Sequence, residues 1–130
     1  MRYSILVSAM ALAQPALAQS DPSATTNSML PHCRDWIARV PTKPADTALA
    51  GVCAGTVAAA LHYSTLLEAA YKSCPPKGVT HGQAIEAVVR YLEAHPETWD
   101  QDFRMAILTA LRTTWPCPRI TRTTFSTTAS

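Results

Sequence analysis

The chain has 130 residues, with 11 Lys and Arg against 9 Asp and Glu, which gives a formal net charge of +2. This near-neutral balance lacks the basic signature of proteins that bind nucleic acids or anionic lipids. The charged fraction of 15% is also low against about 25% in an average domain. A chain of this length is expected to fold around one small core.

The first 18 residues have the layout of a secretory signal peptide. A single cation, Arg2, precedes an apolar stretch at 5–12, and a small-x-small pattern ends at Ala18. The stretch is shorter than the roughly 20 residues that a membrane span needs. We therefore predict cleavage after Ala18 and a periplasmic mature chain, whose charge is +1 once Arg2 is removed. We expect no membrane association after cleavage, because no later stretch reads as apolar enough to span a bilayer.

The segment after the signal peptide is expected to be unstructured. Residues 19–28 are polar and predict a disordered leader, and the folded domain is expected over 29–118. "MLPHCRDWIARV" predicts a short first helix that starts near Pro31. "PTKPADTALAGV" then predicts a loop to the next helix, with Asp46 or Thr47 as the cap.

A long second helix is predicted over Cys53–Tyr71, since "CAGTVAAALHYSTLLEAAY" contains no Pro and is rich in Ala and Leu. At 1.5 Å per residue this helix is roughly 27 Å long. The Cα atoms of a disulfide lie within about 7 Å of each other. Cys53 therefore cannot pair with Cys74, which lies just past the far end of the helix.

The third helix has clear signals at both ends. Thr80 and Gln83 form a capping box, in which each side chain bonds the backbone N–H of the other residue. Pro96 ends the helix, because the residue before a proline is driven out of helical geometry. The helix is thus predicted from about His81 to Ala94. Its apolar face consists of Ile85, Val88, Val89 and Leu92.

A fourth helix is predicted from about Asp100 to Trp115, where Trp-Pro ends it. Thr98 with Gln101, or Asp100 alone, is the expected cap. The apolar positions at helical spacing are Phe103, Ala106, Ile107, Ala110 and Leu111. Residues 119–130 are predicted to be a Thr/Ser-rich tail. The fold class is therefore all-α, a small disulfide-bonded bundle of three main helices plus a short N-terminal helix.

Four cysteines in a short exported chain indicate a disulfide framework; they are Cys33, Cys53, Cys74 and Cys117. No C-x-x-C occurs and no His pair has ligand spacing near a cysteine, which argues against zinc. Three connectivities are possible. The long helix runs up, the third down and the fourth up again, so Cys74 and Cys117 reach the same end of the bundle. We predict Cys74–Cys117, which leaves Cys33–Cys53.

Three segments, "GVCAGTVAAAL", "CPPKGVTHGQAIEAVVRYLEAHPE" and "ALRTTWPC", resemble in order and spacing the Rap/Tai immunity proteins. That family protects bacteria with type VI secretion from cell-wall amidase toxins. The match covers roughly Cys33 to Cys117. The resemblance implies a signal peptide, a small disulfide-bonded helical fold, often a dimer, and a periplasmic protein that binds and inhibits a toxin.

No residue pattern predicts catalysis. The four histidines, His32, His62, His81 and His95, have no carboxylate at a spacing typical of a dyad or triad. His95 is expected to cap helix carbonyls or to pack. The chain has no Gly-rich phosphate loop and no nucleophile elbow. We predict neither an enzyme nor a bound cofactor or metal. The alternative functions are a periplasmic acid-stress chaperone and a helical binding protein without a toxin.

Two surfaces are predicted to bind partners. In the corner His95–Asp102, Trp99 lies among acids and is either an interface anchor for the toxin or a lid on the core. The residues assigned to this partner site are Glu97, Trp99, Asp100 and Asp102. A homodimer is predicted through a stripe of small residues in the second helix, made of Ala54, Ala58, Ala59 and Leu61, for which packing inside the monomer is the alternative.

Overall fold

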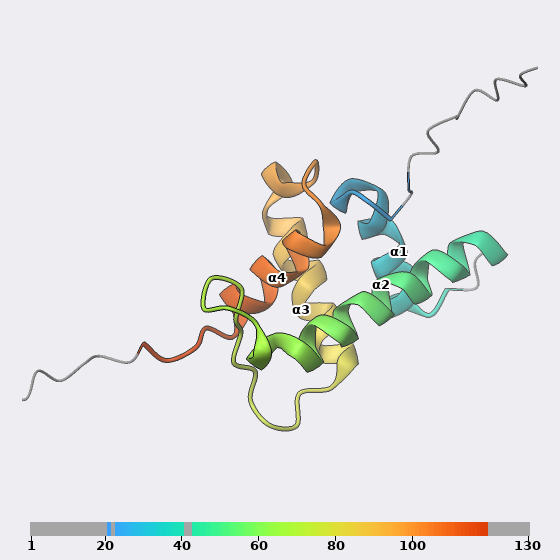
Figure 1. Cartoon of the computed structure of the whole chain (residues 1–130). Coiled ribbons are helices and arrows are strands. Elements are labelled where there is room, and N and C mark those ends of the chain that lie inside the picture. The colour runs from blue at the N-terminus through green and yellow to red at the C-terminus, as the bar shows by residue number, and fades with distance from the viewer. Residues whose placement is uncertain (1–20, 22, 41–42, 120–130) are drawn as a thin grey trace, which may run out of the picture.

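The computed structural model describes residues 21, 23–40 and 43–119, and this part of the chain consists of helices and the loops between them, with no β-strand (Figure 1). The all-α prediction is confirmed. The α-helices are α1 (Thr26–Ala38), α2 (Pro44–Tyr63), α3 (His81–Ala94) and α4 (Phe103–Thr114), with two short 3₁₀ helices, η1 (Ser64–Leu66) and η2 (Pro96–Thr98). The predicted signal peptide and nearly all of the predicted tail lie outside the described residues.

Helix α1 begins earlier than predicted. It starts at Thr26 rather than near Pro31, so residues 26–28 of the predicted disordered leader are helical. The Thr25 side chain caps the helix by accepting a hydrogen bond from the Ser28 backbone N–H. The first N–H groups of a helix have no partner inside it. Here two of them find partners in the corner before α4, as described below.

Helix α2 is displaced toward the N-terminus relative to its prediction. It begins at Pro44, where the fixed φ and missing N–H of proline suit the first turn, and neither Asp46 nor Thr47 is its cap. It ends at Tyr63 rather than Tyr71, because the chain tightens into η1. The buried Ser64 hydroxyl donates to the Leu61 carbonyl at 2.9 Å in this last turn. Cys53 thus lies near the middle of α2 instead of at its start.

Helix α3 has the predicted bounds and lies at the centre of the bundle. The capping box is present, with the Gln83 N–H donating to the Thr80 hydroxyl and the Thr80 N–H donating to the Gln83 side chain. Helices α1, α2 and α4 all pack against α3 (Figure 1). The largest fully buried side chains of the core are Met29, Val57, Ile85, Val88, Leu92, Phe103, Ile107 and Leu111.

Two disulfides close the bundle, and they are the pairs predicted from helix direction. Cys33–Cys53 joins α1 to α2 with a Cα–Cα distance of 5.5 Å, and both cysteines are fully buried in the core. Cys74–Cys117 joins the segment before α3 to the segment after α4 with a Cα–Cα distance of 4.8 Å. No free cysteine remains.

Candidate functional site

The predicted partner site lies in the corner between α3 and α4, at the end of the bundle opposite Cys74–Cys117. Here we call residues His95–Asp102 the acidic corner. The backbone turns through η2 and then through Trp99 before α4 begins at Phe103. The structure brings three of the four assigned residues to this turn as exposed or partly exposed side chains, and gives the fourth, Asp102, a role in the start of α4.

His95 ends α3 as expected from the sequence. Its Nδ1 lies 2.7 Å from the Tyr91 carbonyl oxygen, one of the carbonyls left free in the last turn. Its ring also stacks on the Tyr91 ring, with centroids 4.0 Å apart. This histidine is thus occupied in closing the helix.

Trp99 is half-buried and packs against the hydrophobic core. Its indole Nε1–H donates to the Leu92 carbonyl at 2.8 Å, so the ring is held over the end of α3. The Trp99 carbonyl accepts from the Asn27 N–H at 2.7 Å. The sequence predicted that Trp99 is either an interface anchor or a lid on the core. These contacts favour the lid, and only part of the ring is left at the surface.

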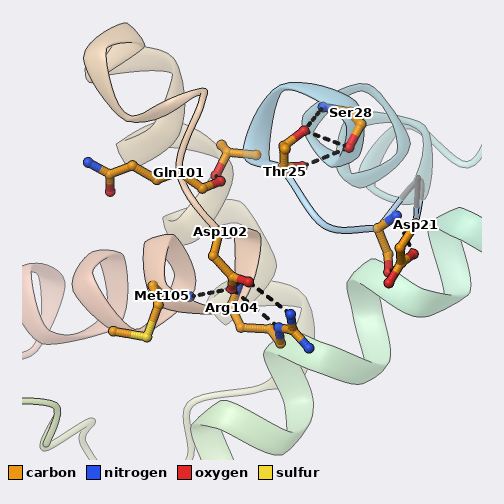
Figure 2. Close-up of polar contacts among 9 residues, drawn as sticks. Asp21, Thr25, Ser28, Gln101, Asp102, Arg104 and Met105 are labelled. Atoms are coloured by element: carbon orange, nitrogen blue, oxygen red, sulfur yellow. Dashed lines mark hydrogen bonds and ion pairs between the residues drawn. The ribbon is translucent and has the colours of Figure 1, made fainter. Parts of the chain in front are cut away.

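Asp102 is the N-cap of α4, a position that was predicted for Thr98 or Asp100. Its carboxylate accepts from the backbone N–H groups of Arg104 and Met105, at 2.9 and 3.3 Å, and from the Arg104 guanidinium at 2.8 Å (Figure 2). The bond from the Arg104 side chain is the main cause that lowers the pKa of Asp102 from 3.8 to about 2. The main role of Asp102 is therefore to stabilise the start of α4.

The start of α1 is attached to the acidic corner, which sequence reasoning missed. The Thr26 N–H donates to the Gln101 carbonyl and the Phe103 N–H donates to the Ala24 carbonyl, each at 3.0 Å. Thr25 and Asp102 form an isolated antiparallel bridge. These bonds satisfy backbone groups at the start of two helices at once. No local signal marks them, because the partners are some 75 positions apart in the sequence.

A shallow hollow lies between the corner and the start of α1. Glu97 and Asp100 are exposed at its edge, and neither side chain forms a hydrogen bond or ion pair with another described residue. The residues lining the hollow are Thr25, Asn27, Pro96, Glu97, Trp99 and Asp100. The hollow combines an aromatic surface with two carboxylates on a backbone fixed by hydrogen bonds, and this arrangement suits a basic protein surface better than a small ligand.

An acid titration isolates the role of Asp102. Because its pKa in the folded protein lies below its ordinary value, its contribution to stability is complete above pH 3.8 and is lost as the pH falls toward 2. We expect the melting temperature of the wild-type protein to fall more steeply over this interval than that of Asp102→Asn, whose amide still caps the helix but does not titrate. Circular dichroism melts from pH 7 to pH 2 measure this difference. Parallel curves for the two proteins would contradict it.

One face of α2 is uncovered. Only Ala50, Cys53 and Val57 of this helix are buried. The exposed positions include no charged residue from Ala48 onward; they are Ala48, Gly51, Val52, Gly55, Ala59, His62 and Tyr63. We call this set the α2 stripe. A helix that is apolar all round is normally buried, so an uncharged exposed face of this length makes the α2 stripe a candidate interaction surface.

The residues of the predicted dimer stripe divide between its two alternatives, a dimer contact and packing inside the monomer. Ala54 and Leu61 are partly buried and pack against the core, while Ala59 faces outward.

From the sequence, no stretch after the signal peptide was expected to be apolar enough to span a bilayer, and the composition of α2 contradicts this expectation. The helical stretch Pro44–Leu66 is long and apolar enough to cross a membrane, although a core helix passes the same test. The added turns from Pro44 onward, with Asp46 as their one charge, account for this difference.

Within the described ranges, no group of three or more His, Cys, Asp or Glu residues is placed to hold a metal ion.

In a comparison with known proteins, the family profile described as Rap1a immunity proteins matches residues 25–117. No curated protein and no solved structure matches the chain. The matched range starts at Thr25, the cap of α1, and ends at Cys117, so it contains all four α-helices and both disulfides.

Proposed function

Because the chain belongs to the Rap1a immunity protein family, we propose that it is a periplasmic immunity protein that binds and inhibits a type VI secretion peptidoglycan amidase toxin. The observation that carries the proposal is the extent of the family match, which covers the whole helical bundle. An immunity protein acts by binding, so it needs a fixed surface rather than catalytic groups. The acidic corner and the α2 stripe are surfaces of this kind.

The disulfides support the periplasmic location. All four cysteines are paired, one pair in the core and one pair at the end of the bundle. Such bonds form and persist in oxidising compartments such as the periplasm. The proposed signal peptide at residues 1–18 would deliver the chain there, to the compartment in which an amidase meets its peptidoglycan substrate.

We place the toxin at the acidic corner. Glu97 and Asp100 are exposed, and the backbone beneath them is held by the bonds to α1. A preorganised surface loses little conformational entropy on binding. The exposed part of Trp99 supplies apolar contact area at the centre, while the two acids are suited to a basic rim around the active-site cleft of the toxin. Asp102 contributes by holding the start of α4.

The test first asks whether a papain-like amidase gene lies beside this one, and it uses that amidase as the partner. We expect the immunity protein, exported to the periplasm, to protect cells that express the amidase there and to bind it in solution. Neutralising the two exposed acids, with Glu97→Gln and Asp100→Asn combined, should slow association about tenfold at low salt, because rim charges act mainly on the on-rate. Stopped-flow or surface plasmon resonance measures this rate.

A control is Glu86→Gln, which neutralises one exposed acid on α3 away from the corner and should leave association unchanged. Failure of the wild-type protein to protect cells or to bind the amidase would overturn the proposed function. Normal binding by the Glu97 and Asp100 variant would keep the function and move the toxin site elsewhere. Suppression of aggregation of unrelated proteins at acid pH, without amidase binding, would favour the chaperone.

We also infer that two copies of the chain associate through the α2 stripe. The stripe carries no Asp, Glu, Lys or Arg side chain that would repel the same side chain of a second copy. The same face of two copies can therefore pack together across a two-fold axis. Gly51 and Gly55 lie one turn apart, and a Cβ at either position would meet no atom within 4 Å. Backbones can therefore approach closely at these glycines.

Light scattering of the mature protein at high micromolar concentration is expected to give the mass of a dimer. Gly55→Glu should give a monomer without a loss in melting temperature, because the new side chain enters open space and glutamate favours a helix over glycine. Thr113→Glu, an equal charge change on the exposed part of α4, should remain dimeric. A wild-type monomer, or sedimentation of the wild-type protein with lipid vesicles, would contradict dimerisation through this stripe.

A further inference from the structure

The two disulfides differ in their surroundings. Cys33 and Cys53 have no exposed surface and belong to the hydrophobic core, between α1 and α2. Cys74 and Cys117 are half-buried and lie outside the core cluster. Each of these two residues is in a segment without regular structure, one before α3 and the other after α4. An external thiolate can thus reach Cys74–Cys117 without disturbing the core, whereas Cys33–Cys53 needs the helices to separate.

Few other bonds hold the segment that precedes Cys74. The Cys74 N–H donates to the Trp115 carbonyl at 2.8 Å, and the Arg112 guanidinium donates to the Ala70 carbonyl. The remaining backbone bonds of this segment are local turns, such as those from Tyr71 and Lys72 to the Glu68 carbonyl. A segment held by so few contacts opens at a low free-energy cost once its covalent link is cut.

A buried hydroxyl next to the disulfide favours that opening. Ser73 is 1% exposed, and its Oγ has no hydrogen-bond partner among the described residues. A buried polar group without a hydrogen-bond partner has lost its hydrogen bonds to water without replacing them, which costs free energy. When the segment opens, the hydroxyl regains water. Ser73 therefore raises the free energy of the closed form relative to the open form, at the residue adjacent to Cys74.

We propose that Cys74–Cys117 is a thiol–disulfide exchange site for a dithiol of the C-x-x-C class, and that its reduction loosens this end of the bundle while the core stays folded. A thiolate of the dithiol attacks one sulfur of the pair, and the other sulfur leaves as a thiolate and takes up a proton. The second thiol of the dithiol then attacks the mixed disulfide. The reductant leaves as a disulfide, and Cys74 and Cys117 become thiols, a balanced two-electron transfer.

This site is independent of the proposed toxin surface. The acidic corner lies at the C-terminal end of α3, and Cys74 precedes the N-terminal end of the same helix. Helix α3 is fixed between them by its packing against three other helices and by its own caps. Reduction at one end thus leaves the corner at the other end in place. The exchange site can be tested without any toxin.

The experiment exposes the oxidised mature protein to dithiothreitol, or to reduced thioredoxin, under native conditions and traps thiols by alkylation at intervals. Mass mapping is expected to show Cys74 and Cys117 modified about tenfold faster, or more, than Cys33 and Cys53. Far-UV circular dichroism of the half-reduced form should retain the helical signal. In denaturant the two pairs should react at similar rates, which would show that the difference comes from the fold.

A variant of the buried serine tests the mechanism. Ser73→Ala removes the unpaired hydroxyl and should slow opening of Cys74–Cys117 about fivefold, with no effect on Cys33–Cys53. Thr113→Ala, an exposed position, is the control and should change neither rate. Reduction of both disulfides in one step, or of Cys33–Cys53 first, would overturn the exchange site. An unchanged rate in Ser73→Ala would overturn the role of Ser73.

Discussion

Replacing Cys33 and Cys53 together by Ala is expected to leave most of the protein unfolded at 37 °C. Loss of the 20-residue loop closure alone costs about 3 kcal/mol in the loop-entropy account. Both sulfurs are also fully buried, so their removal takes packing contacts from the core and adds about 1–3 kcal/mol. The total loss of about 4–6 kcal/mol equals the lower end of the stability of a small domain, which is about 5–15 kcal/mol. The melting temperature by circular dichroism measures the effect.

The matched control is the double variant Cys74→Ser and Cys117→Ser. Its loop is longer, 43 residues, and the entropic loss is about 4 kcal/mol. The half-buried sulfurs, however, have little core packing to lose. We expect this variant to keep a cooperative thermal transition with a reduced midpoint. If the Cys33 and Cys53 variant instead melted at the higher temperature of the two, the core role of that disulfide would be refuted.

Trp99→Ala is expected to destabilise the protein by about 3 kcal/mol, the lower end of the range for removing a large aromatic from a core, because Trp99 is half-buried. The substitution also removes the indole N–H, one of two donors to the Leu92 carbonyl at the end of α3, the other being the His95 backbone N–H. Urea unfolding should show a lower midpoint with little change in slope. Any loss of toxin binding would then have to be measured at a temperature where the variant is folded.

Trp99→Phe separates the ring from its hydrogen bond. Phenylalanine keeps most of the apolar contact but cannot donate to Leu92, so we expect a loss of about 1 kcal/mol. Retained stability of Trp99→Ala together with a collapse of toxin binding would show the opposite of what the contacts indicate. Trp99 would then be an interface anchor with no role in stability, which is one of the two predictions from the sequence. It would not be a residue that packs on the core and contacts the toxin only through its exposed part.

The elements with local signals were predictable. Helix α3 has a capping box at Thr80 and Gln83 and a proline after its end, so both bounds follow from interactions within a few residues. The four cysteines and the helix directions led to the two pairs seen in the structure. The exclusion of Cys53–Cys74 by length had a wrong premise, because it assumed a helix that continues to Tyr71 and α2 ends at Tyr63. The motifs in a match that covers roughly Cys33 to Cys117 also led to the immunity family, which the profile match confirms.

The acidic corner was predicted as a place but not as a set of contacts. Asp102 caps α4 and binds Arg104, although Thr98 and Asp100, which lie five and three positions before Phe103, are also residue types that favour caps. Which of them becomes the cap depends on where η2 ends, and this depends on the packing of Trp99 over α3. The exposed acids Glu97 and Asp100 are those that do not cap a helix.

By itself, the sequence determined the helical class, the bounds of α3, the disulfide framework and the family, since periodicity, caps and cysteine spacing act over short range. Only the tertiary structure decided where α1 begins and which face of α2 stays bare. The first N–H groups of α1 bond to carbonyls of Trp99 and Gln101, far along the chain, so a polar segment becomes helical without any local signal. Helix α2 is apolar on all sides, so its composition could not show which face the neighbouring helices would cover.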